Sequence, residues 1–255
     1  MKRLWLAGIG LLVLAALIQF PAAWIAPRIG SATHDQWRVA AVQGTIWHGS
    51  GTLYADDRSS GRWLPGRGFR WRLAWTEIPK GRLAAQIDFD DGGTAKLSAG
   101  IQGWSLERFD ASMPAAQMAT LLPSALGDYG WSGTLSARGG TFGCNWGRPI
   151  CTGQIELSWK GAGTRQIPGP ALGDYRLRLT AEGEALRFDL GTERGRLQIA
   201  GSGEFSSGKM RFSGEASASG EDSARLDTVL RAVGRPGPTP GHYLIEYRET
   251  LASSG

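Results

Sequence analysis

The sequence has few of the residues that most often carry chemistry. It contains three histidines, His34, His48 and His242, and only two cysteines. No two histidines have the spacing of a metal site, and the chain has no G-x-S-x-G nucleophile elbow, phosphate-binding loop or dinucleotide-binding fingerprint. We therefore expect a protein that is not an enzyme, with no catalytic residues, no metal and no cofactor.

The net charge of the chain is also small. The formal net charge is +5, and Lys2 and Arg3 supply two of these charges. The other cations are dispersed and often alternate with apolar residues, as Arg176 and Arg178 do, which is typical of solvated strand faces rather than of a phosphate track. We therefore do not expect nucleic acid to be a partner of this protein. The acidic residues Asp88, Asp90 and Asp91 suggest a calcium site only weakly, because they continue a polar strand face into a Gly-Gly turn.

Charge is absent altogether from Leu4–Ala26, directly after Lys2 and Arg3. As a helix this range would span roughly 34 Å, enough to cross a hydrocarbon core of about 30 Å. We expect a cytoplasmic tip over residues 1–3 and a transmembrane anchor over residues 4–26, because basic residues favour the cytoplasmic side. A cleaved secretory signal is the alternative, but its apolar core is normally only about 7–15 residues long.

This orientation assigns the rest of the chain to one compartment. In a bacterium, residues 27–255 would form a periplasmic β-rich domain of a single-pass inner-membrane protein. Cys144 and Cys151 fit that oxidising compartment, where closing so short a loop stabilises by roughly 2.5 kcal/mol in the chain-entropy model. A redox site would require C-x-x-C, and a zinc site would require further ligands nearby, so we expect a structural disulfide.

Glycine and tryptophan are abundant, with 38 and 11 copies. Many short strands joined by glycine turns would produce this combination. Alternation of apolar and polar residues with a period of two predicts strands over Phe69–Thr76 and Arg82–Asp90, and around residues 155–159, 175–179, 186–190, 197–199, 210–212 and 243–247. Their spacing favours one continuous, curled, largely antiparallel sheet, although two lobes would also accommodate it.

Two segments have helical rather than strand character. Pro114–Leu122 begins with proline and is followed by Pro123, and Glu221–Val233 carries an apolar stripe and is followed by Gly234. We expect both to be short helices that cap the curled sheet. For the second, a partner-binding helix is the alternative to packing against the core.

The most specific motif lies after the apolar range, in Val42-Gln-Gly-Thr-Ile-Trp-His-Gly49. Gly44, Thr45, Trp47 and Gly49 match the G-T-[VIL]-W-x-G motif of type II secretion system protein N, also called general secretion pathway protein N, which this sequence resembles. The resemblance continues through Phe69-Arg-Trp71 with Trp75, through Gly81-Arg-Leu83 and Leu121-Leu-Pro123, and through Gly153–Trp159. Gly44 and Gly49 would bracket a tight turn or a closely packed strand, and Trp47 would fill the core, so we expect these residues to define the fold rather than to act in function.

The resemblance implies an accessory, non-catalytic component of the machine that exports folded periplasmic proteins across the outer membrane. Its partners would be other secretion components, in the inner-membrane platform or the outer-membrane secretin. The Gly-rich strands of residues 195–218 are also similar to the AsmA-like and bridge-type lipid transfer proteins. That second resemblance implies the alternative function of periplasmic lipid binding or transfer, with lipid as the ligand.

Overall fold

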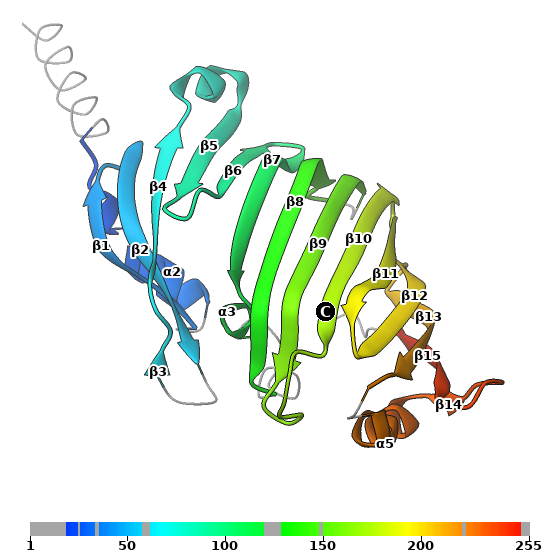
Figure 1. Ribbon diagram of the computed structural model, residues 1–255. Coiled ribbons are helices and arrows are strands. Elements are labelled where there is room, and N and C mark those ends of the chain that lie inside the picture. Colours follow the sequence, from blue (N-terminus) through cyan, green and yellow to red (C-terminus); the bar gives the residue numbers. More distant parts are fainter. Residues whose placement is uncertain are drawn as a thin grey trace, which may run out of the picture.

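A single antiparallel sheet of 15 strands accounts for most of the chain in the computed structural model (Figure 1). The structure describes residues 19–24, 26–33, 36–57, 62–119, 129–147, 150–220 and 223–250. The sheet is open, with β1 (Trp37–Gly44) at one edge and β14 (Arg235–Pro236) at the other. The expectation of a mainly β, continuous antiparallel sheet is confirmed, and the two-lobed alternative is wrong.

The strands follow one another in the sheet nearly in chain order, because tight turns join most neighbours. Gly92 and Gly208 supply the positive φ angles of two of these turns. The strands between the two edges are β2 (His48–Asp57), β3 (Arg62–Trp63), β4 (Arg67–Leu73), β5 (Arg82–Phe89), β6 (Thr94–Gly100), β7 (Gly103–Pro114), β8 (Trp131–Asn145), β9 (Cys151–Thr164), β10 (Gly173–Gly183), β11 (Ala185–Gly195), β12 (Leu197–Ser206), β13 (Lys209–Ala218) and β15 (His242–Thr250). Among the strands that the structure describes, only β3, which pairs with β2, and β14, which pairs with β15, depart from chain order.

Short helices lie at the margins of this sheet. They are the 3-10 helices η1 (Ala22–Trp24) and η2 (Trp75–Lys80) and the α-helices α2 (Ala26–Ala32), α3 (Ala115–Ala119) and α5 (Ser223–Val233). Helix α3 contacts β7, β8 and β2, and the buried Gln117 side chain donates a hydrogen bond of 3.1 Å to the Pro65 carbonyl oxygen. This contact links two parts of the sheet that are far apart in the strand order.

Cross-strand registry gathers the apolar side chains on one face of the sheet. Neighbouring strands align two rows of such residues, because side chains directly opposite each other share a face. The rows are Ala111–Ala137–Leu157–Leu177–Leu190–Gly201–Gly214–Ile245 and Phe109–Gly139–Ile155–Leu179–Phe188–Gly203–Phe212–Tyr247. Most of the large side chains in these rows are only half-buried.

Glycines in these rows make room for rings from the adjacent strands. A Cβ atom added at Gly139 would lie 2.5 Å from the Phe109 ring, and one added at Gly201 would lie 2.7 Å from the Phe212 ring. The Phe188 ring occupies the same kind of space above Gly203. Each pairing lets an aromatic ring cover backbone on the neighbouring strand, which explains why glycine and aromatic residues are abundant together.

Helix α5 covers the C-terminal end of the apolar face. Leu226 and Leu230 are buried, and Leu230 packs with Ala216 of β13 and Tyr243 of β15. The Tyr243 hydroxyl donates a hydrogen bond to the Asp227 carboxylate and, with the Arg231 guanidinium, lowers the pKa of that carboxyl. Core packing of this helix is therefore observed.

Some local expectations were wrong or incomplete. Phe69–Thr76 was expected to be one strand, but β4 ends at Leu73 and Trp75 begins η2, which Gly81 terminates with a φ of 70°. Strands β6 and β7 were not anticipated. In β8, glycines and register shifts between Ser132 and Thr134 and between Gly139 and Phe142 interrupt the alternation.

The expected anchor over residues 4–26 lies mostly outside the described residues. From residue 19 onward, the structure places η1 and the start of α2 in this range. Within the described part of the chain, no helix combines the length and apolar character needed to span a bilayer. The end of the expected helix at Leu122 also lies outside the described residues.

Truncation of a buried leucine in α5 should show how much this helix stabilises the sheet. Leu230 is 4% exposed, whereas Leu244 on β15 is 46% exposed. We expect Leu230→Ala to lower the free energy of unfolding by about 2–5 kcal/mol, because it leaves a cavity. The same truncation at Leu244 should cost less than about 1 kcal/mol. Urea unfolding followed by circular dichroism measures both, and equal costs would contradict the packing role of α5.

Candidate functional site

The motif Gly44–Gly49 forms the turn between β1 and β2. Gly44 and Gly49 are paired across the hairpin, and Gly44 adopts a φ of 90°. Between them, the Thr45 hydroxyl accepts hydrogen bonds from the backbone N–H groups of Trp47 (3.3 Å) and His48 (3.4 Å). The threonine side chain thus satisfies two donors that the turn would otherwise leave unpaired.

Both glycines lie where a side chain would collide with backbone. A Cβ atom at Gly44 would lie 2.5 Å from the His48 carbonyl oxygen. At Gly49 it would overlap the Gln43 carbonyl oxygen and the ring of Trp71 from β4. The indole ring of Trp71 lies over Gly49, and its N–H donates a hydrogen bond of 3.1 Å to the Ile46 carbonyl oxygen.

The same turn receives the segment that precedes the sheet in the chain. Pro21 forms an isolated β-bridge with Thr45, and the Ile46 N–H donates a hydrogen bond of 3.0 Å to the Phe20 carbonyl oxygen. Ala22 is buried at this junction. The motif hairpin, which we define as residues 44–49, is therefore the joint between residues 20–22 and the first strands.

Trp47 contacts the next turn along the same edge. Its ring stacks on that of Trp75 in η2, with centroids 3.6 Å apart and an interplanar angle of 23°. The Leu73 N–H also donates a hydrogen bond of 2.7 Å to the Trp47 carbonyl oxygen. Sequence reasoning placed Trp47 in the core and missed both this stacking and the contact with residues 20–21. Pro79, which lies within η2, was the sequence signal for this turn, because proline interrupts the centre of a strand.

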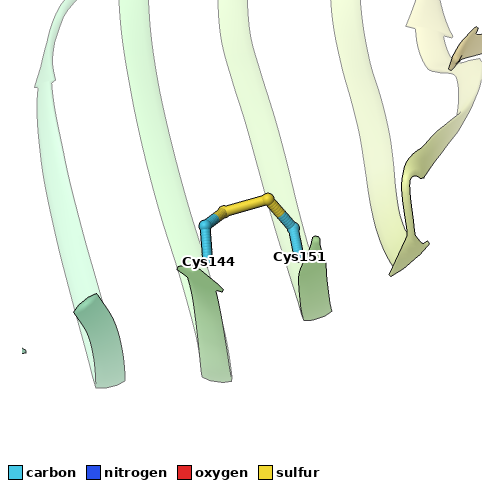
Figure 2. Close-up of a disulfide and its surroundings, with 2 residues drawn as sticks. All are labelled: Cys144 and Cys151. Carbon is cyan, nitrogen blue, oxygen red and sulfur yellow. A yellow bond between two sulfur atoms is a disulfide. The ribbon is translucent and has the colours of Figure 1, made fainter. Parts of the chain in front are cut away.

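Cys144 and Cys151 face each other at the ends of β8 and β9 and form a disulfide (Figure 2). Their Cα atoms are 4.1 Å apart, and no cysteine in the chain is free. The bond joins two neighbouring strands at the turn that contains Trp146.

The acidic side chains near the β5–β6 turn have protein partners. Gln86 and Thr94 donate hydrogen bonds to Asp88 and lower the pKa of that carboxyl. Burial opposes the ionisation of Asp91, but the hydrogen bonds from Arg67 (2.6 Å) and the Gly93 N–H (3.2 Å), with the positive charge of Arg67, together outweigh it and lower the pKa of that carboxyl. Among the residues that the structure describes, no three His, Cys, Asp or Glu side chains are grouped to hold a metal ion.

The apolar face of β8–β12 is the other candidate surface. Leu157, Leu177 and Leu190 are aligned on three successive strands and are only half-buried. On the opposite face, Glu156, Arg178 and their neighbours are charged. One face of the sheet is thus apolar and the other hydrophilic. This arrangement permits binding of an apolar ligand.

Comparison with known proteins gives one match. The family model described as Type II secretion system (T2SS), protein N, matches residues 35–244, a range that includes the motif hairpin, all of the strands β1 to β14 and the start of β15. No curated protein and no solved structure matches the chain.

A methyl group at Gly49 should disrupt the joint. We expect Gly49→Ala to destabilise the fold by about 1–3 kcal/mol, because Gln43 and Trp71 leave no space for the added atom. The matched control is Gly191→Ala on β11, where no atom lies within 4 Å of the added Cβ and φ is not positive. Its effect should stay within about 0.5 kcal/mol. Thermal unfolding compares the two variants. Equal destabilisation would show that the close approach of Gln43 and Trp71 does not prevent a side chain at position 49.

Proposed function

The chain belongs to the type II secretion system protein N family, and from this premise we propose that it is a non-catalytic accessory component of the type II secretion machine in the bacterial inner membrane. It would support the export of folded periplasmic proteins across the outer membrane. The observation that carries the proposal is the family match over residues 35–244.

The proposed topology is a short cytoplasmic tip at residues 1–3, a membrane-crossing segment within residues 4–26 and a periplasmic domain after it. The uncharged sequence of that segment and its basic flank support this orientation. The bridge between Pro21 and Thr45 supports a crossing that ends near Phe20. The motif hairpin would then hold the sheet directly at the membrane, with Gly44, Thr45, Trp47 and Gly49 shaping the joint.

Other components of the secretion machine are the proposed partners, in the inner-membrane platform or the outer-membrane secretin. The disulfide between Cys144 and Cys151 would serve a structural role, because it joins two strands that are already paired. The two edges of the open sheet are β1 and, at the other side, β14 together with the part of β15 that β14 does not pair. They offer backbone groups to such partners, and the proposal does not depend on which edge is used.

Gene deletion tests the secretion role. We expect a strain that lacks this chain to retain folded exoproteins in the periplasm, and the wild-type gene to restore their release. Restoration should also follow when an unrelated single-pass anchor replaces residues 1–18. A cleavable secretory signal in the same place should restore release poorly, because the domain would leave the membrane. Unchanged exoprotein release in the deletion strain would contradict the proposal.

A second candidate function, lipid binding, is favoured by one observation. The apolar rows across β8–β12 are only half-buried, and an acyl chain would cover them. If lipid binds there, native mass spectrometry of the detergent-extracted chain should detect a co-purified lipid. Leu177→Asp, which puts a charge in the centre of the apolar face, should remove it, whereas Arg178→Asp on the opposite face should not. If no lipid is detected with the extracted wild-type chain, the result counts against this function.

A further inference from the structure

We propose that one end of the sheet is a docking surface for the membrane bilayer, so that the domain lies on the membrane as well as being tethered to it. We define this surface, the aromatic rim, by the side chains Phe20, Trp24, Trp75, Ile78, Ile101 and Trp146. The inference deepens the proposed function, because it rests on attachment to the inner membrane through the segment before Pro21.

The rim residues are large, apolar and exposed. Ile101 is 89% exposed, Trp24 is 70% exposed and Trp146 is 59% exposed, and each occupies a turn or a short helix rather than a strand centre. Soluble surfaces seldom gather several such side chains in one region unless something covers them. Tryptophan in particular is enriched where apolar and polar environments meet at a membrane surface.

A chain of contacts joins the rim to the N-terminal segment. The Phe20 carbonyl oxygen accepts a hydrogen bond from Ile46 in the motif hairpin, and Trp47 of that hairpin stacks on Trp75. Figure 1 shows the turns above β1, β4 and β5 on the same side of the sheet as residues 20–24. The Phe20 and Trp24 rings are also neighbours, with centroids 6.0 Å apart. Phe20, Trp24 and Trp75 therefore lie along one edge.

The contacts continue through the next turns. Arg82, just after η2, is paired with Gly100, and the Ile101 side chain approaches Gly81. The indole N–H of Trp146 donates a hydrogen bond of 2.7 Å to the Gly100 carbonyl oxygen. The β8–β9 turn is thus fixed beside the β6–β7 turn, and the rim extends without interruption from residue 20 to residue 146.

The length of the preceding apolar segment places this edge close to the bilayer. A helix from Leu4 to Phe20 would be roughly 25 Å long, slightly less than a hydrocarbon core of about 30 Å. Phe20 would then lie at the level of the interface. Because Pro21 is bridged to Thr45 without an intervening linker, the turns around the motif hairpin must lie at nearly the same depth.

Charge near the rim suits a membrane surface. The exposed cations Arg72, Lys80 and Arg82 lie in or beside η2. Lys80 and Arg82 both form salt bridges with Glu77, the sole acid of η2, so the cations outnumber the acid by two. Lys80 and Arg82 also line an open groove of about 530 Å³ with Ser98. Anionic lipid headgroups would contact these basic and hydroxyl groups next to the apolar side chains of the aromatic rim.

The other ends of the same strands differ. Among the described residues there, Trp63 is the one exposed large hydrophobic side chain, and the Arg38 guanidinium lies over its ring. The β5–β6 turn carries Asp90 and Asp91 instead. On the rim side, the later turn after β10 is acidic, with Glu182 and Glu184. The apolar character is therefore confined to the part of the edge nearest residue 20.

Site-specific fluorescence on the full chain tests the proposal. Because both native cysteines are paired, Ile101→Cys introduces a unique thiol for an environment-sensitive fluorophore. The labelled chain is reconstituted in vesicles of phosphatidylethanolamine and phosphatidylglycerol that contain brominated phosphatidylcholine as a quencher. We expect a shift of emission to shorter wavelength and several-fold stronger quenching than for Gln166→Cys. This control lies beyond β9, at the other end of a strand about 45 Å long.

The possible outcomes distinguish the aromatic-rim proposal from the proposed attachment to the membrane. A chain that does not float with the vesicles overturns both the proposed attachment and the rim. A chain that floats but shows equal, weak quenching at Ile101 and Gln166 overturns the rim alone, as it would if a protein partner normally covered these side chains. Gln102→Cys, next to Ile101 and also exposed, repeats the test with the isoleucine retained, and circular dichroism checks that each variant is folded.

Discussion

A single sheet that must cover its own apolar face is the constraint on which this structure depends. Antiparallel pairing satisfies the backbone hydrogen bonds of 15 strands but leaves one face of the sheet apolar. In a sandwich, a second sheet would bury that face. Here curling, short helices and side chains from the sheet itself cover it, and much of it remains half-buried.

The pairing of aromatic rings with glycine follows from this constraint. A ring that lies over a glycine of the neighbouring strand shields backbone without a second layer, as Phe109 does at Gly139 and Phe212 does at Gly201. The same geometry recurs in the motif hairpin, where Trp71 crosses Gly49. A family motif and the general packing of the sheet therefore have one physical origin, the close approach of an indole or phenyl ring to bare backbone.

The joint at the motif hairpin connects this sheet to its proposed cellular position. Residues 20–22 are joined to the hairpin by a β-bridge and a backbone hydrogen bond, without an intervening linker. Stacking of Trp47 on Trp75 extends that connection to the next turn. A short, hydrogen-bonded connection of this kind constrains the orientation of the domain more than a long flexible linker would.

The sequence by itself determined the mainly β fold, the family and the cysteine pairing, because period-two alternation, a short motif and a nearby cysteine pair are all local signals. It did not reveal β7 or the end of β4 before Trp75. Only the tertiary structure decided that Phe20 and Trp146 belong to one edge. They are brought together by hydrogen bonds and stacking between turns that are far apart in the chain, and such contacts leave no periodic trace in the sequence.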